Sequence, residues 1–118
     1  MTDTSSKAGT NRPAWDAESE FPDFCDQLKK GLSEILDPEL GLNVIQLGLI
    51  RNVKIENDSA VVKMILTTPF CPYGPAMLEN VRVKAEKVLS REVMMDFGLD
   101  PWDFSMMEEG LDLNWGLY

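Results

Sequence analysis

The sequence predicts an α+β fold in which helices pack on one face of a small sheet. Apolar residues recur at helical spacing in two segments, two strand-like segments with a polar turn lie between them, and a third strand-like segment follows. We therefore expect the order helix, strand, strand, helix, strand, short helix. This order is typical of a two-layer sandwich, here with a three-stranded mixed sheet.

The two main helices are expected at residues 23–36 and 75–90. In the first helix, Leu28 and Leu32 lie on the apolar stripe, Leu36 lies beside it, and Cys25 lies at its edge. Cys25 is therefore predicted to belong to the core and to carry no chemistry. The buried stripe of the second helix is formed by Met77, Leu78, Val81, Ala85, Val88 and Leu89.

The first two strands are expected at residues 49–56 and 60–68, joined by a turn at residues 57–59. The second strand is apolar on both faces, which predicts a central position in the sheet. A third strand is expected at residues 93–99. Ser105 could then cap a short helix that extends through Gly110.

Length and composition indicate one domain and exclude several classes of protein. The chain has 118 residues and a formal net charge of -9, which disfavours a nucleic-acid groove. Residues 1–20 are polar, so we expect a disordered tail with an unattached Trp15 and a single domain at residues 21–118. No segment is apolar enough for a signal peptide or a membrane span, and a cytoplasmic location is expected.

The chain contains no histidine, which excludes a Cys-His dyad, a Ser-His-Asp triad and the usual zinc sites within one chain. The two cysteines, Cys25 and Cys71, cannot form a Cys-x-x-Cys site. A disulfide between them is not indicated, because nothing marks the chain as secreted.

Cys71 lies in a stiff segment, residues 67–77, that joins the central strand to the second helix. Three prolines and Gly74 restrict the backbone there. A thiol just before a helix N-terminus faces unpaired N–H groups that favour the thiolate. From this segment alone, a reactive thiol and a small buried apolar side chain are equally good interpretations.

Two further segments carry candidate functional groups. Residues 37–46 contain two carboxylates and two amides, which either support a site or form turns. Near the C-terminus, a cluster of large apolar side chains either forms a partner surface or closes over the core. That cluster comprises Trp102, Phe104, Met106, Met107, Trp115 and Tyr118, and the first four are the expected partner surface. A three-stranded sheet also leaves one face open, which a homodimer would cover.

Several motifs together resemble the PaaD/SufT-like iron-sulfur cluster assembly domain family, which also occurs in cytosolic iron-sulfur targeting factors. The resemblance extends from about Leu28 to the C-terminus. The motifs, in chain order, are Asp37-Pro38-Glu39, Asn43-Val44, Leu47-Gly48-Leu49-Ile50, Thr67-Thr68-Pro69-Phe70-Cys71-Pro72, Pro101-Trp102 and Met106-Met107. The family usually has an acidic residue before Leu-Gly-Leu, where this sequence has Gln46.

The resemblance implies a small α/β fold and a non-catalytic accessory role in cluster assembly or transfer, as part of the SUF system or in delivery to client proteins. It places the functional thiolate, a transient cluster ligand, at Cys71. The polar loop residues expected to support it are Asp37, Glu39, Asn43, Thr67 and Thr68.

One thiolate cannot hold a cluster that needs four ligands, so no tightly bound cofactor is expected. A cluster shared transiently with an assembly scaffold, a client or a second subunit is expected, or a persulfide exchanged at Cys71.

Two alternatives stay open from the sequence. The first is a protein-interaction module of a multicomponent monooxygenase or assembly complex, in which Cys71 is structural and residues 102–107 form the partner surface. The second is a thiol enzyme, which lacks a base such as histidine.

Overall fold

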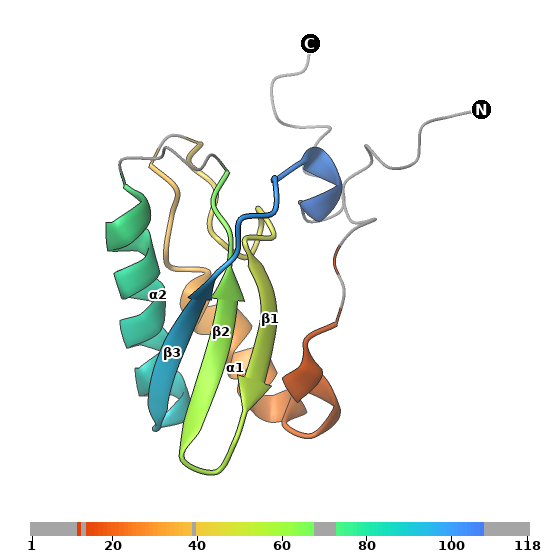
Figure 1. Cartoon of the computed structure of the whole chain (residues 1–118), viewed down its shortest axis with the longest axis vertical. Helices are drawn as coiled ribbons and strands as arrows, with labels where there is room; N and C mark the ends of the chain where they lie inside the picture. Colours follow the sequence, from red (N-terminus) through yellow and green to blue (C-terminus); the bar gives the residue numbers. More distant parts are fainter. Residues whose placement is uncertain (1–11, 13, 39, 68–72, 108–118) are drawn as a thin grey trace, which may run out of the picture.

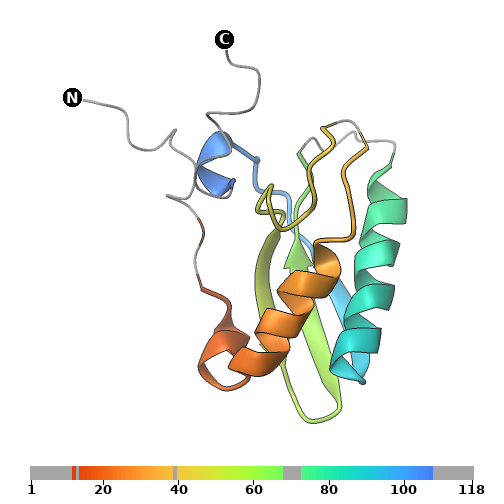
Figure 2. The same ribbon diagram turned by 180° about the vertical axis from the view of Figure 1, so that it is seen from behind.

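The computed structural model describes residue 12 and residues 14–38, 40–67 and 73–107. Its elements are η2 (Asp16–Ser19), α1 (Pro22–Leu32), β1 (Ile50–Ile55), β2 (Ser59–Met64), α2 (Gly74–Leu89), β3 (Glu92–Phe97) and η3 (Phe104–Met106). Both α-helices lie on one face of the three-stranded sheet (Figures 1 and 2). The predicted α+β class and element order are confirmed.

The sheet has the order β1-β2-β3, with β2 in the centre as predicted. β1 and β2 are antiparallel and joined by the short turn, whereas β2 and β3 are parallel. A parallel pair needs a crossover connection, and α2 supplies it. The mixed sheet therefore follows directly from the hairpin and the strand–helix–strand unit.

A bulge in β1 changes which side chains face the core. Ile50 pairs with Met64 but Asn52 pairs with Lys63, so Arg51 is an extra residue on β1. Simple alternation would place Ile50 and Val53 on opposite faces. The extra residue lets both side chains be buried.

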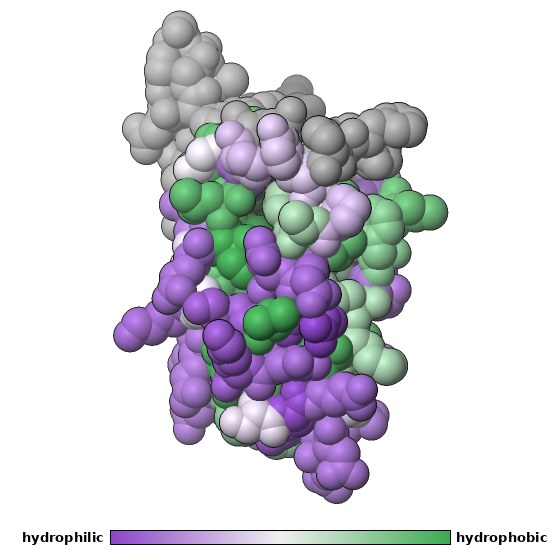
Figure 3. Space-filling view, turned by 90° about the vertical axis from the view of Figure 1, so that its left-hand side faces the viewer, coloured by the Kyte–Doolittle hydropathy of each residue, from purple (hydrophilic) through white to green (hydrophobic). Residues whose placement is uncertain are grey.

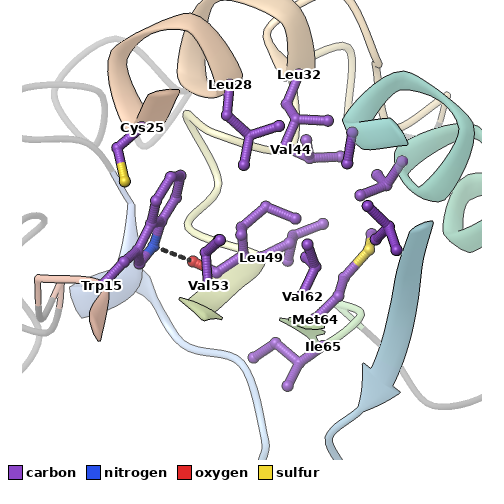
Figure 4. Packing of buried hydrophobic residues seen from close by; sticks show 14 of the residues in the cluster. Trp15, Cys25, Leu28, Leu32, Val44, Leu49, Val53, Val62, Met64 and Ile65 are labelled. Atoms are coloured by element: carbon purple, nitrogen blue, oxygen red, sulfur yellow. Dashed lines mark hydrogen bonds between the residues drawn. The ribbon is translucent and has the colours of Figure 1, made fainter. Parts of the chain in front are cut away.

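The core lies between the sheet and the two helices. Leu28 and Leu32 of α1 face Val53 and Val62 of the sheet there, and Cys25 points toward Trp15 at the edge of the cluster (Figure 4). Gly31 allows the helices to approach closely, because a Cβ at this position would lie 3.2 Å from Val88 Cγ2. The predicted core position of Cys25 is confirmed.

α1 ends at Leu32, earlier than the predicted residue 36. The Ser33 hydroxyl donates to the Lys29 carbonyl oxygen at 2.7 Å at the helix end. Leu36 then pairs with Asn43 in an isolated antiparallel bridge, and its side chain is 55% exposed. Pro38 disfavours a helical conformation at the residue before it, so the backbone becomes extended ahead of the proline.

The expected tail through residue 20 is wrong for its last residues. Trp15 is only 7% exposed, and its Nε1 donates to the Ile50 carbonyl oxygen at 3.3 Å (Figure 4). Lys29 Nζ lies 5.1 Å from the centre of the Trp15 ring. We call residue 12 and residues 14–19 the N-terminal strap. Residues 1–11 and 13 lie outside the described residues.

The end of the described chain closes over the core. η3 is capped by Asp103 rather than by Ser105, because Asp103 Oδ1 accepts hydrogen bonds from the Ser105 N–H, at 2.8 Å, and from the Ser105 hydroxyl. Met106 and Met107 are buried, which supports closure over the core and corrects their assignment to a partner surface. Residues 108–110 of the predicted helix lie outside the described residues.

Within the described part of the chain, no helix combines the length and the apolar character that a membrane crossing requires.

Candidate functional site

The motif residues that the structure describes gather at one end of the sheet. We call it the loop end: residues 33–38 and 40–49 between α1 and β1, residues 65–67 after β2, and residues 98–107 after β3 (Figures 1 and 2). The C-terminal ends of the parallel strands β2 and β3 and the N-terminal end of α2 lie on this side. The topology alone therefore brings distant sequence motifs together.

Asp37 lies at the loop end and is a buried acidic residue, only 1% exposed. Its Oδ1 accepts a hydrogen bond from the Leu40 N–H at 3.3 Å, and its Oδ2 accepts one from the Thr67 hydroxyl at 3.4 Å. Two of the predicted polar site residues, 30 positions apart in the chain, are thus in contact. Glu39, Thr68 and Cys71 lie outside the described residues.

Asn43 and Gln46 stabilise a turn at residues 43–48. The Gln46 N–H donates to Asn43 Oδ1 at 2.7 Å, and the Asn43 N–H donates to Gln46 Oε1 at 2.9 Å. As in a capping box, each of two residues three positions apart accepts a hydrogen bond from the backbone N–H of the other. The turn-forming interpretation of Asn43 is therefore supported. Gln46 acts here as a hydrogen-bond acceptor, and this contact needs no negative charge.

Three side chains from outside the 43–48 turn donate to its carbonyl oxygens. Arg12 of the N-terminal strap donates to Ile45 O at 3.0 Å and to Met106 O at 2.7 Å. Trp102 Nε1 donates to Leu47 O at 2.7 Å, and Arg51 donates to Gly48 O at 3.0 Å. The turn is therefore the place where both ends of the described chain are attached to the domain.

The role of Arg12 has no signal in the sequence. A single arginine in a polar N-terminal segment has no periodicity or spacing that would indicate a contact 94 residues away in the chain. Trp102 was assigned to the partner surface and is half-buried. Its hydrogen bond to Leu47 gives it a structural role as well.

Gly48 is required by its surroundings. Its φ is +73°, in the left-handed region that favours glycine, and a Cβ there would lie 1.9 Å from the Met106 carbonyl oxygen. The Leu47-Gly48-Leu49 motif therefore has a structural cause, since the C-terminal segment crosses directly over this glycine.

Burial changes the acid–base behaviour of two groups near the strap. Burial of Arg51, assisted by the nearby Arg12, lowers the pKa of its guanidinium, while Asp100 and Asp103 act in the opposite direction. Burial raises the pKa of the Cys25 thiol, and the Glu18 carboxylate adds to this rise. Cys25 is a free, buried cysteine and is therefore poorly suited to thiolate chemistry.

The described residues supply little metal-binding capacity at the loop end. Within that part of the chain, no three His, Cys, Asp or Glu residues lie together in a way that could hold a metal ion. Asp37 supplies hard oxygen donors, whereas iron-sulfur clusters are held by thiolates. Cys25, the cysteine that the structure describes, lies in the core instead.

Taken together, the fold and the loop end define a small α+β domain whose polar motif residues converge at one end of an open sheet. The family model described as iron-sulfur cluster assembly protein matches residues 26–94, and the chain belongs to this family. The resemblance noted from the motifs is confirmed.

Individual relatives agree with this assignment. An Fe-S protein maturation auxiliary factor from Porphyromonas gingivalis is 38% identical over 101 residues, which cover 83% of this chain and 96% of the relative. The Fe-S protein maturation auxiliary factor SufT from Staphylococcus aureus is 35% identical over 77 residues, covering 62% and 86%. Both relatives are named as auxiliary factors rather than as enzymes, in agreement with an accessory role.

The fold is also similar to that of a solved structure. The crystal structure of a domain of unknown function from Bacillus anthracis matches with a TM-score of 0.72 and 26% sequence identity. The match covers 87% of this chain and 100% of that chain. The α+β architecture is therefore shared with a protein of low overall identity.

Proposed function

We propose that this protein is an accessory factor that assembles iron-sulfur clusters or transfers them to client proteins through the thiolate of Cys71. The observation that carries the proposal is the contact between Asp37 and Thr67 in a member of this family. It joins the acidic motif to the start of the Cys71 segment. This contact supports a single site that contains both motifs rather than two separate loops.

The position of Cys71 in the sequence supports a reactive thiol. The residue lies between Thr67, which follows the central strand, and Gly74, the first residue of α2. α2 is 16 residues long, and the positive end of its dipole favours a thiolate near its first turn. A neighbouring carboxylate has the opposite effect on a thiol, and Asp37 is hydrogen-bonded to Thr67, four residues before Cys71.

In this proposal the cluster is cargo rather than a resident cofactor. A thiolate is the soft ligand that iron-sulfur clusters require, but one thiolate falls short of the usual four ligands. Cys71 would therefore share the cluster with an assembly scaffold, a client or a second subunit, or exchange a persulfide. The SUF system and the cytoplasm are the expected setting.

The decisive experiment replaces Cys71→Ala in cells that depend on this protein. We expect the activity and cluster content of client iron-sulfur enzymes to fall to the level of the deletion strain, while the circular dichroism and unfolding curve of the purified variant match wild type. Cys25→Ala is the matched control and should retain client maturation, because Cys25 is buried in the core. Full client activity with Cys71→Ala would contradict the thiolate mechanism.

Anaerobic reconstitution with iron and sulfide then separates two modes of action. A carrier should gain cluster absorbance and mass in the wild-type chain but not in Cys71→Ala. A separate incubation with a low-molecular-weight persulfide tests the other mode: a chain that acts by persulfide exchange should gain the mass of one sulfur at Cys71, with release of the donor's thiol and without cluster absorbance.

The second candidate function is a pure interaction module in which Cys71 is structural. Exposed apolar side chains at the loop end, including Phe97 and Leu99, favour it. This alternative predicts that Cys71→Ser has no effect on clients, whereas loss of the apolar surface breaks the complex.

A further inference from the structure

Four of the six large apolar side chains that are exposed among the described residues lie at the loop end or at its border, whereas Val83 and Met94 lie elsewhere. Leu36, Tyr73, Phe97 and Leu99 belong to it or to its border, and Leu99 is 81% exposed. Viewed from the α2 side, hydrophobic residues lie mainly in the upper part of the molecule, whereas hydrophilic residues cover most of the lower part (Figure 3). This uneven distribution marks the loop end as a surface for contact.

Within this surface lies a groove of about 190 Å³ between the end of β2 and the segment after β3. Its walls are mainly apolar and come from Leu66, Phe97, Leu99, Pro101 and Trp102, with Thr67 and Asp100 as polar residues. We call it the 66–102 groove.

The walls of the groove are held by hydrogen bonds to the domain. The Gly98 N–H donates to Met64 O at 2.8 Å, which continues the pairing of β3 with β2. At the other end, Trp102 Nε1 donates to Leu47 O. Because both ends of the lining segment are attached, the groove is pre-formed. Binding of a ligand therefore does not include the entropic cost of ordering this segment.

The rim of the groove is acidic. Residues 96–103 contain three exposed carboxylates, Asp96, Asp100 and Asp103, and neither lysine nor arginine. Lys63 Nζ lies 3.7 Å from Asp100, and Arg51 interacts electrostatically with Asp100 and Asp103, but neither cation lines the groove, whereas Asp100 does. A second copy of a chain with net charge -9 would bring like charges together here, whereas a basic partner would not.

We infer that the 66–102 groove docks an extended segment of a partner protein that presents one apolar side chain beside lysine or arginine. The apolar side chain enters between Leu66, Leu99 and Trp102, and the basic residue faces Asp100. That the partner is an iron-sulfur assembly protein or client rests on the proposed function.

Docking in the groove would bring the partner close to the candidate thiol. Thr67 lines the groove, and Cys71 follows it by four residues. At 3.8 Å between consecutive Cα atoms, their Cα atoms cannot be more than about 15 Å apart. A partner held in the groove therefore stays within reach of Cys71.

The test begins with a displayed library of random dodecapeptides, selected on the full-length chain. The proposal expects an enriched consensus with an aliphatic or aromatic residue next to Lys or Arg. The affinity of the consensus peptide is then measured by fluorescence anisotropy at low and high salt. Leu99→Ser should weaken binding at least about fivefold, because it removes a large apolar contact. Asp100→Asn should weaken it about two- to threefold at low salt and less at high salt, as expected for an exposed charge.

Two matched controls lie outside the groove. Met94→Ser removes an apolar side chain that is 58% exposed on β3, and Asp58→Asn removes an exposed carboxylate at the hairpin turn. Both should leave peptide affinity unchanged. The inference is overturned if no peptide is enriched, if the consensus is acidic, or if Leu99→Ser binds like Met94→Ser. It is also overturned if Leu99→Ser changes only the sedimentation of the chain, which would identify a second copy as the occupant.

Failure of this inference can be told apart from failure of the proposed function. Cys71→Ala should bind the consensus peptide with wild-type affinity. If client maturation requires Cys71 but Leu99→Ser has no effect on peptide binding or maturation, the docking site is wrong and the proposed function stands. If the peptide binds as expected and Cys71→Ala matures clients fully, the thiolate function is wrong and the docking site stands.

Discussion

Two stretches outside the sheet and the two α-helices pack over the domain: the N-terminal strap, and the C-terminal segment at residues 98–107. The strap directs its aromatic side chain, Trp15, into the core. The C-terminal segment has two parts that differ in burial: residues 105–107 are buried, whereas Leu99 is largely exposed. Both stretches are attached to the same 43–48 turn, through Arg12 and Trp102.

This difference separates structural from functional apolar residues. Trp15 is buried, and its N–H donates a hydrogen bond to a strand carbonyl oxygen. Its structural role in the core therefore accounts for this residue. Exposed Phe97 and Leu99 are not explained by packing, although the segment around them is anchored. The C-terminal segment is therefore the better candidate for contact with a partner, and the strap for stability.

The largest expected effect tests the strap. Trp15→Ala should lower the free energy of unfolding by about 4 kcal/mol, because it leaves a large cavity and an unpaired Ile50 carbonyl oxygen. Urea denaturation followed by circular dichroism measures this loss. Leu36→Ala, at a large apolar residue that is mostly exposed, is the control and should change stability by less than about 0.5 kcal/mol.

The same variant should also expose Cys25, whose sulfur points toward Trp15 in Figure 4. Because burial raises the pKa of this thiol, the neutral form persists to higher pH and native Cys25 should resist iodoacetamide at neutral pH. Alkylation monitored by mass spectrometry should accelerate in Trp15→Ala. A strap that merely rests on the surface would give neither the stability loss nor the change in reactivity.

A smaller loss of stability is expected from a change that disturbs the packing of the C-terminal segment against Gly48. Gly48→Ala should cost about 3 kcal/mol, since alanine is strained at this φ and its Cβ would collide with the Met106 carbonyl oxygen. Gly41→Ala is a matched control, because Gly41 has a φ of +72° with nothing within 4 Å of the added Cβ. It should cost only about 1 kcal/mol, the backbone term alone. Equal losses in the two thermal or urea unfolding experiments would show that the crossing over Gly48 contributes nothing.

The smallest effect concerns the turn that both stretches share. Gln46→Glu should change stability by less than about 0.5 kcal/mol, because a carboxylate oxygen can accept the Asn43 N–H as the amide oxygen does. Gln46→Ala should cost about 1 kcal/mol, since the acceptor is lost. If Gln46→Glu instead changes client maturation with no change in stability, charge at this position has a role beyond the turn.

Local patterns were sufficient to predict most regular elements. Helical periodicity placed α1 and α2, and the two-sided apolar pattern of residues 60–68 correctly indicated the central strand. The predicted first helix ended four residues too late, because the bridge between Leu36 and Asn43 competes with the last helical turn. Element boundaries depend on such competition, which periodicity does not describe.

The candidate site was predicted in part. The motifs indicated that Asp37 and Thr67 belong to one site, and the structure joins them by a hydrogen bond. Arg12 had no sequence signal, and Met106 and Met107 were assigned to a surface although they are buried. Apolar composition shows that side chains leave water, but it does not show whether they enter this core or a partner.

The sequence by itself therefore determined the α+β class, the element order, the core position of Cys25 and the family. These depend on side-chain periodicity and on short motifs, which are local properties of the chain. The tertiary structure alone decided that the strap packs, that Gly48 lies beneath Met106, and that Leu99 is exposed whereas Met107 is buried. Those outcomes depend on contacts between residues far apart in the chain, where several apolar segments compete for one small core.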